Sequence, residues 1–221
     1  MLDVFRVNNV AFTFMDYPMS YLELVGTIFY LWSVWLIAKR QILTWPIGIV
    51  SVFLYMALFY QIRLYADAFE QVYYLGVSFY GWWRWNKPQQ NTKNTLRIQY
   101  SSRLEIILWI GITIMFAIMA GALISRLHLW FPNLFPETAS FPFLDALTTI
   151  MSFTAMWLMT QKRIESWIYW VIVDVIGIGL YFIKEIRFVA LLYIILLILA
   201  IKGLVEWQRA ASASSQYLDL A

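Results

Sequence analysis

The sequence predicts an all-α membrane protein with seven transmembrane helices, in which two parallel three-helix repeats are joined by one linking helix, a 3+1+3 arrangement. Three observations lead to this fold class. Of the 221 residues, 62% are hydrophobic and 13% are charged, whereas about 25% of an average soluble domain is charged. Seven apolar runs are long enough to cross a bilayer, and the first three match the last three at a fixed offset. Nearly the whole chain is therefore expected inside a membrane.

Each apolar run is expected to be a helix, because backbone groups in lipid must be satisfied within the segment. The first run follows Pro18 and Ser20, which is typical of a helix start. The second begins with Trp45 and Pro46, and proline is tolerated there because its missing N–H would have no partner in the first turn. The predicted spans are residues 21–38, 45–62, 65–84, 104–124, 143–160, 167–184 and 188–207.

The domain organisation follows from these spans. Because successive spans cross the membrane in opposite directions, the loops lie alternately on its two sides. Eleven of the sixteen basic residues then fall on one side. The positive-inside rule makes that side cytoplasmic, with the N-terminus outside and the C-terminus inside. The predicted segments are an outer N-terminal segment (1–20), the first repeat (21–85), a cytoplasmic linker with the linking helix and an outer loop (86–142), the second repeat (143–207) and a cytoplasmic tail (208–221).

An offset of 122 residues superimposes the two three-helix units without a gap. Tryptophan and glycine are uncommon, so their recurrence at one offset is not expected by chance. The matched pairs are Trp35 and Trp157, Trp45 and Trp167, Gly81 and Gly203, and Trp85 and Trp207. Such repeats place a substrate site near the midplane, between the halves.

The linking span carries no charge after Glu105 and is expected to face lipid. Its Ala117-x-x-x-Gly121 spacing allows another helix to approach closely, which suggests packing in an oligomer.

The composition excludes several kinds of protein. Cysteine is absent and His128 is the single histidine, so zinc, haem and iron–sulfur groups lack ligands and no cofactor is expected. The sequence has no basic stripe for nucleic acid and no glycine-rich loop for ATP hydrolysis. An intramembrane enzyme would need a base beside a nucleophile, but His128 falls in a predicted outer loop, away from Ser51, Ser78 and Ser152. A membrane sensor is the remaining alternative to a transporter, and the repeat favours transport.

The segment WIYWVIVD, from Trp167 to Asp174, places a carboxylate in an apolar helix beside two indoles. Trp167, Trp170 and Asp174 share one helix face. An ionisable group at membrane depth costs about 2.5 to 3.5 kcal/mol on insertion scales and marks a functional site by default. We therefore predict a substrate site in which the indoles hold a flat cationic ring and Asp174 pairs with its charge. The alternative is structural, with interfacial tryptophans and an Asp174 that pairs with Lys202.

The third and last spans supply further candidates. Gln71, Tyr74 and Trp82 can share one helical stripe, although a polar amide in an apolar helix also serves as a bundle hydrogen bond. Tyr80 lies near the predicted cytoplasmic end, where belt residues are common. Tyr193 is the candidate from the last span, because the offset equates it with Gln71.

Two long motifs carry a resemblance to a known family. The stretch from Trp45 to Trp85 ends in YGWWRW, and the stretch from Trp167 to Trp207 begins with WIYWVIVD. Over about 21–207 the chain resembles the Pnu family of bacterial vitamin transporters. The family's W-x-x-W-x-x-x-[ND] pattern matches Trp167, Trp170 and Asp174, and its Q-x8-Y-G-W pattern matches Gln71, Tyr80, Gly81 and Trp82.

The resemblance implies a SWEET-like fold, a homotrimer and a place in the bacterial cytoplasmic membrane. It also implies facilitated diffusion of nicotinamide riboside, thiamine or riboflavin, with trapping by a separate cytoplasmic vitamin kinase. Nicotinamide riboside transporters typically carry asparagine where this chain has Asp174 and Lys202. Because a carboxylate suits a cation, thiamine is the favoured substrate and nicotinamide riboside, also a cation, is the alternative.

Overall fold

The computed structural model describes residues 6–14, 17–87, 96–133, 135, 137–138 and 140–219. The predicted spans are confirmed as helices to within two residues at each end, except that the last helix continues far beyond its predicted end and includes most of the predicted tail. Part of the predicted linker, residues 88–95, lies outside the described residues. The helices are α1 (Tyr21–Ala38), α2 (Thr44–Gln61), α3 (Tyr65–Trp85), α4 (Arg103–Ile124), the short α5 (Leu127–Trp130), α6 (Pro142–Thr160), α7 (Glu165–Ile183) and α8 (Arg187–Asp219).

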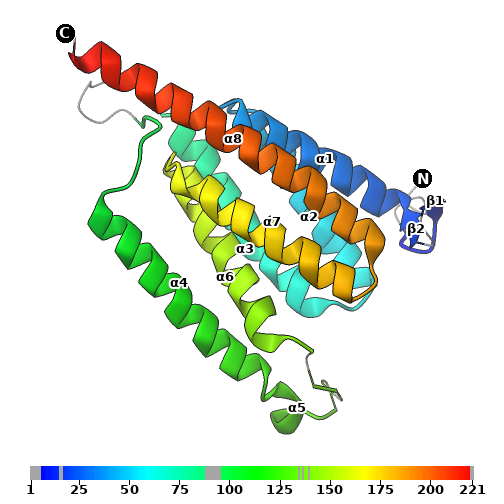
Figure 1. The fold of residues 1–221 in the computed structure, drawn as a ribbon. Helices are drawn as coiled ribbons and strands as arrows, with labels where there is room; N and C mark the ends of the chain where they lie inside the picture. The colour runs from blue at the N-terminus through cyan, green and yellow to red at the C-terminus, as the bar shows by residue number, and fades with distance from the viewer. Residues whose placement is uncertain are drawn as a thin grey trace.

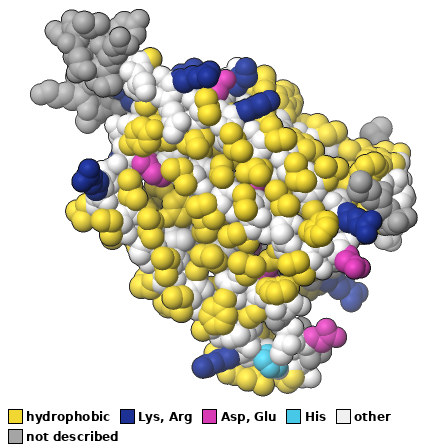
Figure 2. Space-filling model, in the orientation of Figure 1, with side chains coloured by type: hydrophobic (Ala, Val, Ile, Leu, Met, Phe, Trp, Pro, Cys, Tyr) yellow, Lys and Arg dark blue, Asp and Glu magenta, His cyan; other side chains and the backbone are white. Residues whose placement is uncertain are grey.

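Within the described residues, six of these helices are long and apolar enough to cross a membrane by length and composition, and α3 is the long helix that is not. Its sequence explains the difference, since it carries Asp67, Glu70 and Arg84. The visible face of the molecule is largely hydrophobic across its middle (Figure 2). The described chain is therefore a multi-pass membrane protein, in which α3 is the most polar of the long helices.

The N-terminal segment departs from the all-α expectation. Strands β1 (Val10–Phe14) and β2 (Tyr17–Ser20) form an antiparallel hairpin. The Tyr17 ring stacks on Phe188 of α8, with ring centroids 5.0 Å apart. Ser20 then begins α1 as predicted, because its side chain accepts a hydrogen bond from the Glu23 N–H at 3.1 Å. The hairpin and the C-terminal end of α8 lie at opposite ends of the helix bundle (Figure 1).

Six helices close into a ring. In the order α1, α2, α3, α6, α7 and α8, each packs on the next, and α8 packs back on α1. The two contacts that join the first three helices to the last three are α3 with α6 and α8 with α1. A ring of this kind encloses a centre to which every one of its helices can contribute side chains.

Helix α4 lies outside this ring, beside α6 (Figure 1). Ala117 and Gly121 are buried on its inner side, and a Cβ on Gly121 would overlap with Phe143 of α6. Their small side chains therefore serve close packing within the chain, which corrects the expectation that the spacing marks an oligomer contact. Most of the other α4 side chains are exposed apolar groups, such as Leu104, Ile107 and Ile118, as expected for a lipid-facing linker.

Four helices end in the same way, with a non-glycine residue at positive φ. The four are Arg40, Arg63, Lys162 and Glu185, with φ of 61°, 63°, 53° and 59°. After α1, the N–H of Arg40 donates to the carbonyl of Ile37, and the N–H of Gln41 donates to that of Leu36. This is the Schellman pattern, in which a left-handed residue satisfies the last carbonyls of a helix. Lys162 follows Arg40 by 122 residues, and Glu185 follows Arg63 by the same interval.

Candidate functional site

A cluster of polar side chains occupies the middle of the ring, one from each of its helices. The Tyr30 side chain interacts electrostatically with Asp174 and Tyr74, although α1 is adjacent to neither α7 nor α3 in the ring. These interactions therefore cross the centre. Five of the six residues come from the middle parts of their helices, and Tyr193 lies in the second turn of the long helix α8. We call them the central cluster: Tyr30 (α1), Tyr55 (α2), Tyr74 (α3), Ser152 (α6), Asp174 (α7) and Tyr193 (α8).

Asp174 is the ionisable acid of this cluster. Its exposed fraction is 3%, and within the described residues its carboxylate accepts no hydrogen bond and forms no ion pair. The predicted structural partner, Lys202, is exposed and makes no ion pair in the described part of the chain. A buried charge is normally paired, because desolvation of an isolated carboxylate is costly. Asp174 is thus a buried acid without a hydrogen bond or ion pair within the described residues, and its contact with substrate stays a prediction.

Tyr193 approaches Asp174 from α8 because a glycine makes room for it. Its ring lies directly on Gly177, where a Cβ would be 2.5 Å from the ring. The same ring stacks on Tyr181 with centroids 5.3 Å apart. The close α7–α8 contact brings Tyr193 within electrostatic reach of Asp174. Two candidates that the sequence places on different helices therefore meet in the structure.

Tyr30 and Tyr55, like Ser152, are cluster members that the sequence analysis did not predict as substrate contacts. Their rings pack edge to face, with centroids 6.3 Å apart and an interplanar angle of 87°. The Tyr55 hydroxyl lies 2.7 Å from the Thr27 hydroxyl, which fixes the ring in α2. No motif marks these tyrosines, and the only signal was a polar-tipped aromatic residue in the middle of an apolar span.

Helix α3 contributes Tyr74 and, beside the cluster, Gln71. The Tyr74 and Ser152 hydroxyls are hydrogen-bonded, and the Tyr74 ring packs edge to face on Phe153. Gln71 is half-buried, and its amide has no hydrogen bond within the described residues. The bundle hydrogen bond that was the structural alternative for Gln71 is therefore not formed in the described chain.

The predicted site residues Trp167 and Trp170 belong to a layer of tryptophans nearer one end of the ring. Trp167 is 1% exposed and packs against Gly203 and, edge to face at 5.7 Å, against Trp207. Trp170 is half-buried against the same core. The structure gives Trp167 a packing role, and its contact with substrate stays a prediction.

The tryptophan layer, defined by Trp45, Trp85, Trp167 and Trp207, has matching contacts in the two halves. Trp45 packs against Gly81 and Trp85 as Trp167 packs against Gly203 and Trp207. The Trp85 indole donates to the Thr160 carbonyl at 3.2 Å, and the Trp207 indole donates to the Ile37 carbonyl at 3.1 Å. Each half thereby hydrogen-bonds the end of the first helix of the other half.

A basic side chain lies against this layer. The Lys162 ammonium is 4.6 Å from the centroid of the Trp85 ring. Burial, together with the nearby charge of Arg40, lowers the pKa of Lys162 from its usual value. The layer thus carries positive charge at the end that the sequence predicts to be cytoplasmic.

Three other predicted site residues lie away from the central cluster. Tyr80 stacks on Trp157 with centroids 5.2 Å apart, and its hydroxyl accepts a hydrogen bond from Arg84 Nη1 at 3.0 Å. Trp82 is 39% exposed, and Lys202 is exposed on α8. The structure does not bring these side chains together with Asp174.

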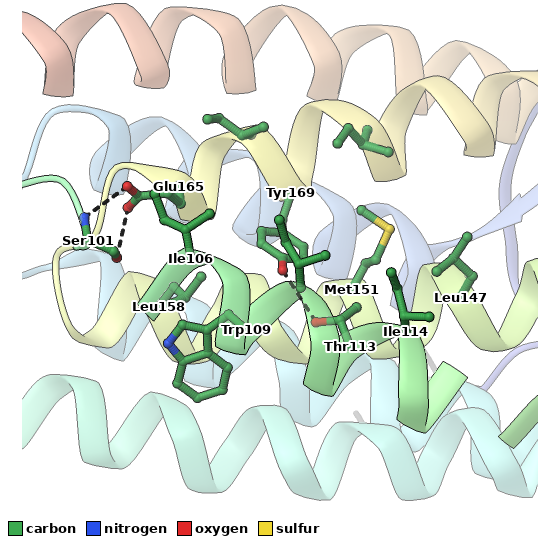
Figure 3. Close-up of a pocket in the computed structure, with 13 residues that line it drawn as sticks. Ser101, Ile106, Trp109, Thr113, Ile114, Leu147, Met151, Leu158, Glu165 and Tyr169 are labelled. Atoms are coloured by element: carbon green, nitrogen blue, oxygen red, sulfur yellow. Dashed lines mark hydrogen bonds between the residues drawn. The ribbon is translucent and has the colours of Figure 1, made fainter. Parts of the chain in front are cut away.

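A separate cavity of about 310 Å³ lies between α4, α6 and α7 and contains no residue of the central cluster (Figure 3). Glu165 closes one end of it by accepting hydrogen bonds from the N–H and hydroxyl of Ser101. Thr113 and Tyr169 meet in its middle, with their hydroxyls 3.4 Å apart. The rest of its lining is almost entirely apolar, which suits the lipid-facing side of the bundle rather than a water-soluble ligand.

A ring of membrane helices around a buried polar centre is an arrangement typical of transporters of small molecules. The family model described as "Nicotinamide mononucleotide transporter" matches residues 20–209. The chain belongs to this family, and the resemblance to the Pnu vitamin transporters is confirmed. Its coarse function is therefore the transport of a vitamin across a bacterial membrane.

Named relatives cover nearly the whole chain. It is 29% identical to the nicotinamide riboside transporter PnuC of Escherichia coli (strain K12), over 95% of this chain and 96% of that protein. It is 26% identical to the riboflavin/roseoflavin transporter RibM of Streptomyces davaonensis, over 91% of each. A crystal structure of the vitamin B3 transporter PnuC matches with a TM-score of 0.63 at 20% identity, over 87% of this chain and 83% of that one, and supports the fold. These relatives give no support to thiamine.

Proposed function

We propose that this chain carries nicotinamide riboside across the cytoplasmic membrane by facilitated diffusion. The observation that carries the proposal is Asp174, a buried carboxylate that has no hydrogen bond or ion pair within the described residues and interacts with Tyr30 and Tyr193 in the middle of the ring. Nicotinamide riboside combines a positively charged pyridinium ring with ribose hydroxyls. Aromatic faces attract such a ring, and a carboxylate can pair with its charge or accept hydrogen bonds from the hydroxyls.

The choice of nicotinamide riboside over thiamine rests on the named relatives. The carboxylate that favoured thiamine suits both molecules, because both are cations. Nicotinamide riboside is the substrate named for the PnuC relatives, and riboflavin is named for RibM. Riboflavin is uncharged and would leave Asp174 unpaired, so the charge of the site favours nicotinamide riboside.

The chemistry of the centre also favours a nucleoside over the nucleotide in the family's description. A phosphate group would need a lysine, an arginine or a helix N-terminus as its partner. The central cluster has none of these, and Asp174 would repel a phosphate. Phosphorylation by a cytoplasmic kinase would therefore make a product that the centre rejects, so uptake becomes one-way.

The transport cycle that we propose is a rocking of one three-helix unit against the other. Two features support parallel repeats: the Schellman caps recur at an offset of 122 residues, and the tryptophan layer has matching contacts in both halves. The homotrimer and the orientation stay predictions. Since the chain has no cysteine, single-cysteine variants test the orientation. In intact cells an impermeant thiol reagent is expected to label Glu137→Cys and not Asn86→Cys, and the opposite result would reverse the orientation.

The substrate is tested by calorimetric titration of the purified protein with four ligands: nicotinamide riboside, nicotinamide mononucleotide, thiamine and riboflavin. We expect micromolar binding of nicotinamide riboside and at least about tenfold weaker binding of the other three, a difference of about 1.4 kcal/mol. Tighter binding of thiamine would restore the substrate that the sequence favours. Tighter binding of the nucleotide would contradict the argument from charge.

A further inference from the structure

We propose that the central cluster discriminates between the oxidised and the reduced form of its ligand. The oxidised pyridinium nucleoside is bound and carried, and the reduced dihydropyridine nucleoside is rejected. The two forms differ by one hydride on the ring, so the oxidised ring is a cation and the reduced ring is neutral. The inference rests on the proposed function, because it concerns the same ligand and the same site.

The first support is the unpaired carboxylate. Asp174 is 3% exposed and has neither a hydrogen bond nor an ion pair within the described residues. A pyridinium ring supplies the positive charge that the buried carboxylate lacks. A dihydropyridine ring supplies no charge, and its binding would leave the carboxylate buried and uncompensated.

The second support is the sign of the charges around the cluster. Across the described residues, the ionisable groups other than tyrosines that interact with the cluster tyrosines are all acids, and no lysine, arginine or histidine is among them. Glu23 acts on Tyr55, Glu70 acts on Tyr74 and Tyr193, and Asp174 acts on Tyr30 and Tyr193. In a low-dielectric centre such a field favours a cation and gives no advantage to a neutral ring of the same size.

The third support is the aromatic surround. Tyr30 and Tyr193 interact electrostatically with Asp174, and Tyr30 also interacts with Tyr55 and Tyr74. The faces of tyrosine rings carry negative charge density and attract a cation delocalised over a flat ring. The ribose and carboxamide are the same in both redox forms, so their contacts cannot discriminate. Discrimination must come from the ring charge.

The test compares the two forms as a matched pair of ligands. Calorimetry on the purified protein, and uptake into proteoliposomes, would be measured with the oxidised and the reduced nucleoside. We expect the oxidised form to bind at least about tenfold more tightly. Equal binding of both forms would overturn the inference and leave the proposed function intact. Binding of neither form would overturn the proposed function itself. The wild-type comparison needs no variant, so it does not depend on the folding of a mutant.

Variants then assign the discrimination to Asp174. In Asp174→Asn the preference for the oxidised form is expected to fall to about threefold or less, because the amide is uncharged. The matched control is Asp145→Asn, which removes a carboxylate that pairs with Lys184 at 3.6 Å and interacts with no cluster member. It is expected to keep the wild-type preference. A preference that survives in Asp174→Asn would overturn the role of this carboxylate.

Discussion

The tryptophan layer has matching contacts in the two halves of the molecule, whereas the central cluster differs between them. In the layer, Trp45 with Gly81 has the same contacts as Trp167 with Gly203. In the cluster, the position equivalent to Asp174 is the apolar Val52. Packing is thus shared between the halves, whereas the charged chemistry belongs to one of them. In the transport cycle proposed above, the two like halves rock about their centre and the distinct carboxylate selects the ligand.

The largest effect is expected from substitutions of the two glycines that pack against the tryptophan layer. Gly81→Ala and Gly203→Ala each place a Cβ inside the indole beneath, Trp45 or Trp167. Each is expected to lower the free energy of unfolding by about 2 to 3 kcal/mol, since overpacking forces side chains off their rotamers. Thermal unfolding in detergent measures the loss. The control is Gly179→Ala, where a Cβ meets nothing within 4 Å; an equal loss there would contradict the packing argument.

The next largest effect is expected at Asp174, the position at which the central cluster differs between the two halves. Asp174→Ala is expected to weaken nicotinamide riboside binding by about tenfold, or about 1.4 kcal/mol, because the ring charge loses its partner and no amide replaces the carboxylate. Stability should change little, since the removal of an unpaired buried charge offsets the loss of side-chain packing. The equivalent position in the other half is the control, and Val52→Ala should change affinity by less than about threefold. Unchanged affinity in Asp174→Ala would show that this acid has a structural role.

A smaller effect concerns the two hydrogen bonds that join the halves. Trp85→Phe and Trp207→Phe remove the indole donors to the carbonyls of Thr160 and Ile37. Each is expected to cost about 1 kcal/mol from the lost hydrogen bond, with a further loss from the smaller ring. Chemical unfolding of the two variants in parallel measures the costs. A loss of stability in only one of the two variants would show that the two hydrogen bonds between the halves do not contribute equally.

The smallest effect concerns the Schellman caps. Arg40→Gly and Lys162→Gly relieve a positive φ at equivalent helix ends and are expected to stabilise the protein by about 0.5 to 1 kcal/mol. Lys162→Gly should gain less, because it also removes the ammonium 4.6 Å from the Trp85 ring. Melting temperatures of the two variants give the comparison, and destabilisation in Arg40→Gly would contradict it.

The sequence predicted the helices well because helix formation in a membrane is a local requirement. An apolar run must satisfy its own backbone, so the spans and the start of α1 at Ser20 follow from composition and short motifs. The hairpin before α1 was missed, since its contact with Phe188 joins segments far apart in the chain. The continuation of α8 was also missed, because a polar segment carries no membrane signal.

The central cluster was predicted in part. Asp174 was predicted as an intramembrane acid, Tyr74 from the stripe it shares with Gln71, and Tyr193 as the offset equivalent of Gln71. All three lie in the cluster, and their contact with substrate stays a prediction. Tyr30 and Tyr55 were missed, because the sequence does not show which tyrosines of an apolar span face the centre of the ring. The sequence by itself determined the family, the membrane spans and the presence of a carboxylate, Asp174, within one of these spans. Only the tertiary structure decided which helix faces meet, and therefore that Trp167 packs in the scaffold while Asp174 is left without a partner, because contacts between helices depend on how the whole ring closes.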